Sequence, residues 1–177
     1  MRLVFTKGSG KSDRLEVFTS TPQPVTIECP KQRIIPHDMM HFAVESTLMV
    51  RGFLTRIQEG ERAVFQMQGN DQSDAVERLV EVFQGDEWSG RKTEARHMLE
   101  MYTLTCSARG CPTMSIDEAA ILEVRDSIAQ LTSRWETVPI GGKLELHFPS
   151  VPRAAGARQG SCRLIYAASG CIGSALE

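Results

Sequence analysis

The chain has 177 residues, of which 41% are apolar, 24% charged and 6% aromatic, a composition typical of one soluble globular domain. Its 20 basic and 22 acidic residues nearly balance, which argues against a general nucleic-acid binder. No apolar run approaches the roughly 18 residues that a membrane span requires. We therefore expect a cytoplasmic protein with neither nucleic acid nor membrane as a partner. In that compartment an odd number of cysteines favours free thiols: Cys29, Cys106, Cys111, Cys162 and Cys171.

Two short β-prone runs at 3–6 and 15–18 predict an N-terminal hairpin, with turn residues at 8–12 between them. The turn reads Gly-Ser-Gly-Lys-Ser, which invites comparison with a phosphate-binding loop. Such a loop needs a glycine where this chain has Phe5, and it needs a helix to follow rather than a strand. We therefore interpret the segment as a turn. A proline-rich linker follows, in which 25–27 is a candidate strand.

Helical periodicity dominates the middle of the chain. Pro36 is suited to the first helical position and Gly60 to a stop, so one long helix is predicted from Pro36 to about Gln58. Three more amphipathic helices are predicted, at 74–85, about 92–106, and 115–135. The first and the last of them start with capping-box spacings, Asp74/Glu77 and Ser115/Glu118.

After Trp135 the apolar period changes to two, which predicts a strand at 143–148 with one buried face. The expected fold class is α+β: a small antiparallel sheet, made of the hairpin and this late strand, packed against about four helices. We expect a single domain over 1–149. Residues 150–177 are rich in small residues and are expected to form a flexible or loosely docked tail.

The helix that starts at Pro36 carries the most informative pattern. About two thirds of its circumference is apolar, which places it at the centre of the fold. At about 100° per residue, the remaining arc holds His37, Asp38, His41 and Glu45. These side chains face either solvent or a polar pocket, and in a pocket buried imidazoles and carboxylates need partners.

Residues four apart on a helix can share one ion, so His37 with His41, or His41 with Glu45, is a candidate pair for zinc or a similar divalent metal. Asp38 with His41, three residues apart, is another candidate pair. All of them cannot bind the same ion, because His37 and Glu45 are roughly 12 Å apart along the helix axis. Further ligands must come from elsewhere, and His97 near Glu100 is the expected source, ahead of His147. Asp38 and Glu45 are the candidate acid/base groups.

The two-histidine helix differs from that of the metalloproteases, in which a glutamate follows the first histidine and acts as general base. Here that residue is Asp38, one methylene shorter. The sequence pattern Pro-His-Asp-x-x-His-x-x-Val-Glu at 36–45 resembles a helix in a group of small bacterial proteins of unknown activity. The resemblance implies a bacterial cytosolic protein of similar fold, and it implies no activity.

Two functional hypotheses remain from the sequence. The first is a metal-binding or acid/base protein with hydrolase-like chemistry at His41 and its neighbours. The second is a non-catalytic interaction module, expected to be a homodimer, in which the polar stripe is structural and methionines supply adaptable apolar surface. Five of the eight methionines fall on the two helices concerned: Met39, Met40, Met49, Met98 and Met101. No substrate or small-molecule ligand can be read from the sequence.

Overall fold

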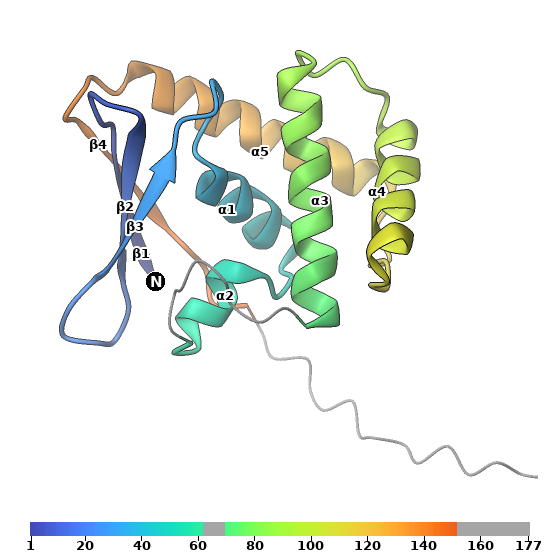
Figure 1. The fold of residues 1–177 in the computed structure, drawn as a ribbon, viewed down its shortest axis with the longest axis horizontal. Coiled ribbons are helices and arrows are strands. Elements are labelled where there is room, and N and C mark those ends of the chain that lie inside the picture. Colours follow the sequence, from blue (N-terminus) through green and yellow to red (C-terminus); the bar gives the residue numbers. More distant parts are fainter. Residues whose placement is uncertain (62–69, 152–177) are drawn as a thin grey trace, which may run out of the picture.

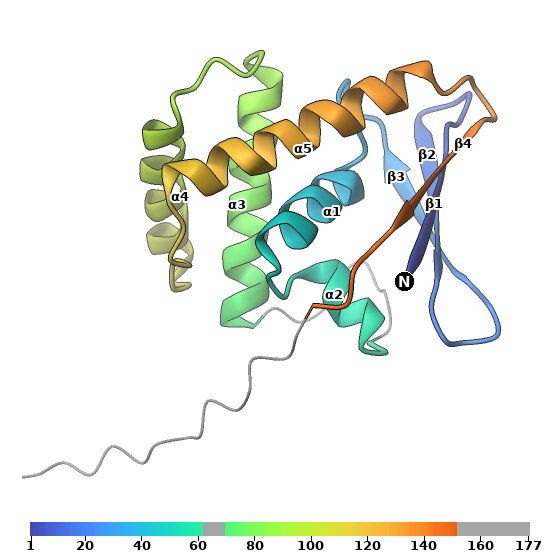
Figure 2. The ribbon, with the colours of Figure 1, turned by 180° about the vertical axis from the view of Figure 1, so that it is seen from behind.

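The computed structural model describes residues 1–61 and 70–151. Within them, one antiparallel sheet has the strand order β3-β2-β1-β4, and all the helices lie on one side of it (Figures 1 and 2). The strands are β1 (Arg2–Thr6), β2 (Ser12–Phe18), β3 (Val25–Pro30) and β4 (Lys143–His147). The predicted α+β class is confirmed, including the N-terminal hairpin and the late strand, which pairs with β1.

Alternation along the strands gives the sheet one buried face. Leu15 and Val17 of β2 and Leu144 and Leu146 of β4 point toward the helices, while their neighbours face outward. β3 is longer than the predicted run at 25–27 and forms one edge of the sheet.

The helices are α1 (His37–Leu48), α2 (Phe53–Gln58), α3 (Asp71–Trp88), α4 (Ala95–Arg109) and α5 (Glu118–Thr137). α1 contacts α2, α3 and α5, and α5 passes behind α3 in Figure 1 and in front of it in Figure 2. The prediction that the apolar helix after Pro36 is central to the fold is confirmed, because Met39, Met40, Ala43 and Val44 are fully buried.

The prediction of one continuous helix from Pro36 to Gln58 is wrong. α1 ends at Leu48, Met49 adopts a left-handed conformation with φ of 53°, and the chain turns before α2 begins after Gly52. The cause is the side chain of Glu45, which accepts hydrogen bonds from the first backbone N–H groups of α2. A buried carboxylate thus satisfies a second helix N-terminus, which a continuous helix would not expose.

Two other helix starts also differ from prediction. α3 begins at Asp71 with a capping box between Asn70 and Ser73, instead of at Asp74, and it continues past Gly85 to Trp88. α5 is capped by Asp117, whose side chain accepts from the Ala120 N–H, instead of by Ser115. In both cases a better capping residue lies a few positions from the predicted one.

The methionines divide between core and surface. Met39, Met40 and Met98 are fully buried, whereas Met49 and Met101 are about two-fifths exposed, at 42% and 44%. The described cysteines, Cys29, Cys106 and Cys111, are buried free thiols. The predicted tail at 150–177 lies almost wholly outside the described residues, as do Cys162 and Cys171. None of the helices in the described ranges combines the length and hydropathy needed to cross a bilayer.

Candidate metal centre

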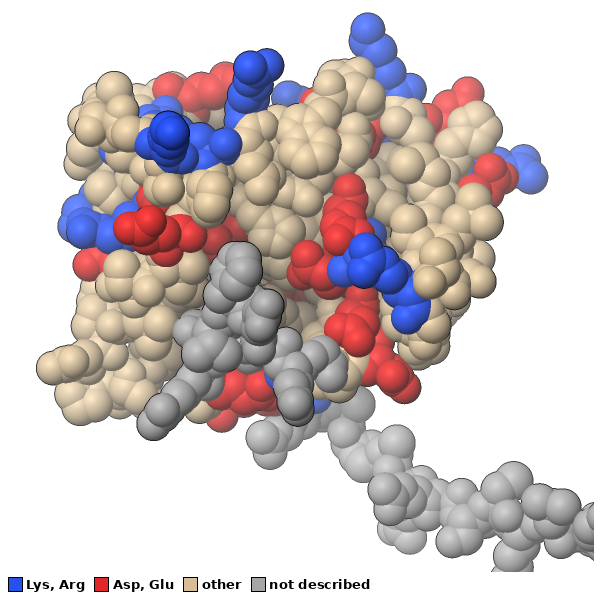
Figure 3. Space-filling view, in the orientation of Figure 1, with Lys and Arg blue, Asp and Glu red and all other residues tan. Residues whose placement is uncertain are grey.

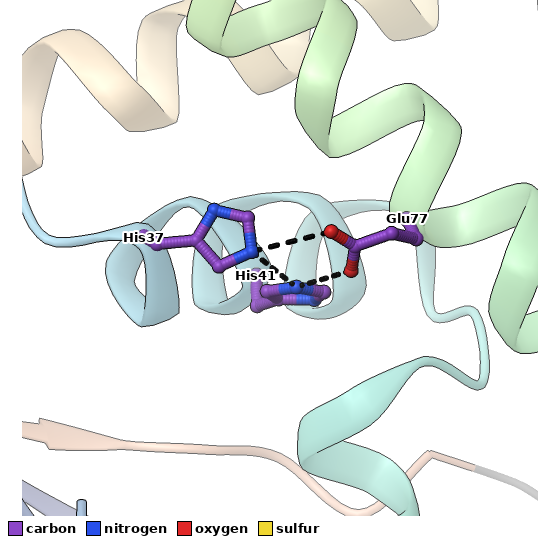
Figure 4. A group of neighbouring side chains, drawn as sticks. All are labelled: His37, His41 and Glu77. Atoms are coloured by element: carbon purple, nitrogen blue, oxygen red, sulfur yellow. Dashed lines mark hydrogen bonds and ion pairs between the residues drawn. The ribbon is translucent and has the colours of Figure 1, made fainter. Parts of the chain in front are cut away.

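Two imidazoles and one carboxylate converge where α1 packs against α3. His37 and His41 extend from successive turns of α1, and Glu77 reaches toward them from α3 (Figure 4). The Nε2 atoms of the two rings are 3.2 Å apart. Glu77 Oε2 lies 3.0 Å from His41 Nε2, and Glu77 Oε1 lies 3.4 Å from His37 Nε2. This group could hold a metal ion.

The spacing of these atoms suits a small divalent ion. Ligand atoms that lie 2.0 to 2.1 Å from a tetrahedral zinc ion are separated from one another by about 3.3 to 3.4 Å. The Nε2 atoms of the two rings are 3.2 Å apart, which is close to this value. Glu77 contacts each ring through a different oxygen, at 3.0 and 3.4 Å, and with one ligand atom from each residue all three atoms lie within 4.8 Å of one another. To bind one ion, a single Glu77 oxygen would therefore have to approach both rings.

Glu45 holds the other side of the His41 ring. Its carboxylate is fully buried, and one oxygen lies 3.2 Å from His41 Nδ1. It also accepts from the N–H groups of Gly52, Leu54 and Thr55 and from the Thr55 hydroxyl, at 2.8 to 3.0 Å. Glu45 was predicted as both a metal ligand and an acid/base group. In the structure Glu45 instead contacts His41 Nδ1, whereas Glu77 contacts His41 Nε2.

The contact with Glu45 determines which nitrogen of His41 carries a proton. A carboxylate only accepts hydrogen bonds, so Nδ1 must be the donor. In a neutral ring Nε2 then carries a lone pair, and that lone pair faces the oxygen of Glu77 and the Nε2 atom of His37. Lone pairs that converge in this way repel one another unless a cation, either a proton or a metal ion, lies between them.

The ionisation of the site in the metal-free protein follows from the same contacts. Burial alone would lower the pKa of His41, but its hydrogen bonds to Glu45 and Glu77 and their negative charge outweigh burial and raise the pKa to about 10. Burial raises the pKa of Glu77, but the nearby His37 and His41 outweigh it and hold that pKa well below its usual range. A proton on His41 therefore occupies the position that a metal ion would take.

A cavity of about 780 Å³ opens beside the group, a size usual for ligand sites. Its walls come from β3 and the residues after it, from α1, from α2 and from α3, and they include the two histidines and Glu77. Arg56 of α2 also lines the cavity and bonds to Glu61 and Ser73. Three of the four residues of the polar arc, His37, Asp38 and His41, thus line a cavity, and Glu45 does not.

Asp38, the other predicted acid/base residue, lines the same cavity and is 7% exposed. Its Oδ2 atom accepts a hydrogen bond from the thiol of Cys29 at 3.1 Å, which links α1 to β3. Burial and the adjacent Asp38 charge raise the pKa of the Cys29 thiol far above its usual range, so this cysteine keeps its proton, donates a hydrogen bond to Asp38 and is not a thiolate ligand.

The other predicted ligands lie elsewhere. His97, on α4, has a side chain that is 60% exposed and lies 4.0 Å from Glu94. Glu100 pairs with Arg96 on the surface of the same helix. His147, at the end of β4, is 76% exposed and lies near Glu145. None of these three belongs to the group around His41 or lines the cavity.

Glu77 is the candidate ligand that the sequence did not indicate. The capping-box interpretation of Asp74 and Glu77 gave it a local role at a helix start. The helix in fact begins three residues earlier, with the capping box at Asn70 and Ser73, so Glu77 lies in the second turn and is free to contact α1. The Asn70-x-x-Ser73 spacing was the signal that could have corrected the boundary.

Comparison with known proteins adds no named relative: no family model, no curated protein and no solved structure matches this chain.

Proposed function

We propose that the protein binds one divalent metal ion through His37, His41 and Glu77, with Glu45 as the residue that orients His41. The observation that carries this proposal is the convergence of His41 Nε2, His37 Nε2 and the Glu77 carboxylate within 3.0 to 3.4 Å. A carboxylate on the far nitrogen of a ligating histidine is the usual support for a metal-bound imidazole. Two imidazoles and a carboxylate suit zinc, and also non-haem iron(II).

We further propose that the site performs hydrolytic chemistry. Three protein ligands with an open position are typical of catalytic zinc sites, in which the ion supplies an activated water. The cavity gives a substrate access to this position. Asp38 is the available proton acceptor, because it lines the cavity and its Oδ1 atom has no partner among the described residues. Glu45 is unsuited to that role, because its oxygens already accept several hydrogen bonds.

Metal analysis and zinc titration test the proposed site. Protein purified without a histidine tag should contain close to one equivalent of zinc, iron, manganese or nickel per chain. After removal of metal with EDTA, calorimetric titration should show one zinc site. Glu77→Gln should weaken zinc binding by about 100-fold or more, since it removes a ligand. Asp38→Asn should leave zinc affinity unchanged, because Asp38 is not a ligand.

Exposed histidines supply matched controls. His97→Ala and His147→Ala remove imidazoles that lie outside the group, so both variants should bind zinc as the wild type does. His41→Ala should abolish binding, and circular dichroism will show whether it folds. Zinc binding that is unaffected by Glu77→Gln, or that is lost in His97→Ala, would mean that the ion binds elsewhere. The group would then be a buried ion pair without a metal.

A further inference from the structure

The cavity beside the metal group is bounded on one side by the free edge of the sheet. Within residues 1–61 and 70–151, β3 pairs only with β2, and its residues 26–30 line the cavity. An unpaired strand edge presents a row of backbone donors and acceptors that an extended chain can pair with.

The register of β2 and β3 shows which backbone groups face the free edge. The Lys31 N–H donates to Lys11 O, which makes that pair a hydrogen-bonded one. Alternation along an antiparallel ladder then directs the backbone of Ile27 toward β2, and that of Thr26 and Glu28 away from it. In the described part of the chain, the N–H groups of Thr26 and Glu28 have no acceptor. The backbone of Pro30 also points away from β2, and because proline has no N–H it suits an edge strand.

The opposite wall of the cavity is acidic. Asp74, Glu77 and Glu81 of α3 line it, and acidic side chains gather along α3 on the face shown in Figure 3. Glu81 pairs with Arg78, and Glu77 contacts the histidines. Asp74 and Asp38 have no cationic partner in the ranges that the structure describes. Among the described residues, Arg56 is the one arginine that lines the cavity, and it is paired with Glu61.

We infer that the cavity binds an extended peptide segment, with its backbone paired to the free edge of β3 and a lysine or arginine side chain directed toward Asp74. Thr26 and Glu28 would provide the donors and acceptors for the peptide backbone, and the acidic wall of α3 would select a cationic side chain. His37, His41 and Glu77 line the same cavity, so a bound peptide would lie beside the proposed ion. The presence of that ion rests on the proposed function.

Peptide titration followed by amide NMR tests the inference on the full chain, with and without zinc. The probe is acetyl-Thr-Val-Lys-Val-Thr-amide, and it should shift the amide signals of Thr26 and Glu28 at about 1 mM or below. A matched peptide with Glu in place of Lys should bind about tenfold more weakly. The Lys peptide with alternate backbone amides N-methylated should not bind, because it cannot pair with a strand edge.

Two pairs of variants separate the edge from the acidic wall. Thr26→Pro removes an N–H group at the free edge and leaves the hydrogen bonds between β2 and β3 in place. It should weaken binding of the Lys peptide about tenfold, whereas Thr26→Val should leave this affinity unchanged. Asp74→Asn should reduce the preference for Lys over Glu. Asp71→Asn, in the same first turn of α3 but outside the cavity lining, should leave it unchanged.

The outcomes for peptide and metal are distinguishable. The inference is overturned if the Lys peptide does not bind, if Thr26→Pro or N-methylation has no effect, or if Lys and Glu peptides bind equally. Zinc binding in Thr26→Pro is measured separately and should equal that of the wild type. Peptide binding at the β3 edge in a protein that binds no zinc would refute the metal centre and leave the strand-edge site standing.

Discussion

Glu45 is the residue on which both the local fold and the site depend. Its buried carboxylate bonds to His41 and to the N-terminus of α2, so one side chain ends one helix, starts the next and fixes the orientation of a candidate ligand. No sequence pattern shows this, because its backbone partners lie seven to ten residues away, across a turn that only the folded chain forms.

Replacing Glu45 with glutamine should therefore be costly. The change keeps the shape but removes the charge, and it places an amide NH₂ group among donors. We expect Glu45→Gln to lower the free energy of unfolding by about 3 kcal/mol or more, measured by urea denaturation. Glu100→Gln, which removes a charge from an exposed ion pair, should change it by less than about 0.5 kcal/mol. Equal effects of the two changes would contradict the role given to Glu45.

The buried imidazole of His41 makes stability depend on pH in the metal-free protein. Its pKa is raised from 6.5 to about 10, so its stabilising contribution is complete below pH 6.5 and is lost as the pH rises toward 10. The pKa of Glu77 is lowered from 4.5, so its contribution is complete above pH 4.5 and is lost as the pH falls through the lowered pKa. Both contributions are therefore complete between pH 4.5 and pH 6.5.

The prediction for His41 concerns a difference between two proteins. With EDTA present, His41→Gln should be less stable than the wild type at pH 6, and the gap should narrow as the pH approaches 10. Urea midpoints at several pH values in this range measure the gap. A gap that stays constant across the range would show that His41 is not held in its charged form by Glu45 and Glu77.

At the scale of elements, the short turn between α1 and α2 brings Glu45 against Gly52. A Cβ atom at Gly52 would lie 2.6 Å from Val76 Cγ1 and 2.7 Å from the Glu45 carboxylate. Only glycine allows this approach, which explains why a residue inside the predicted long helix instead marks the start of a new one. The broken helix in turn allows the Arg56 side chain of α2 to line the cavity.

Two glycine substitutions should have opposite effects. Gly52→Ala should destabilise the protein by about 1 to 3 kcal/mol and weaken zinc binding, because the new methyl group displaces Glu45. Gly85→Ala, within α3 and with open space around the added Cβ, should stabilise it by about 0.5 to 1 kcal/mol and leave zinc binding unchanged. Thermal unfolding and zinc titration check both. If Gly52→Ala changed neither the stability nor the zinc affinity, Glu45 could move without cost.

Periodicity was sufficient to predict the type of most elements. The apolar stripe of α5 and the alternation of Leu144 and Leu146 in β4 arise from neighbours in sequence, so they can be read directly. His37 and His41 could be paired for the same reason, since they lie one turn apart. Glu77 could not, because its approach to them depends on how α3 packs against α1, which no local pattern encodes.

At the scale of the whole molecule, the proposed ion would join α1 to α3 and so stabilise the fold. Zinc at 100 times its dissociation constant should stabilise the protein by about 2.7 kcal/mol, which raises the melting temperature by roughly 5 to 10 °C. Glu77→Gln should show almost no increase at the same zinc concentration. An equal increase in both proteins would assign the stabilisation to a site other than this one.

Anomalous diffraction from crystals of the zinc-loaded protein would locate the proposed ion. One strong peak should lie about 2.0 to 2.2 Å from the Nε2 atoms of both His37 and His41 and from an oxygen of Glu77, with the Glu45 carboxylate bonded to His41 Nδ1. A structure in which zinc is found only at surface residues such as His97 or His147, while His41 still contacts Glu77 directly, would show that His37, His41 and Glu77 do not bind the ion.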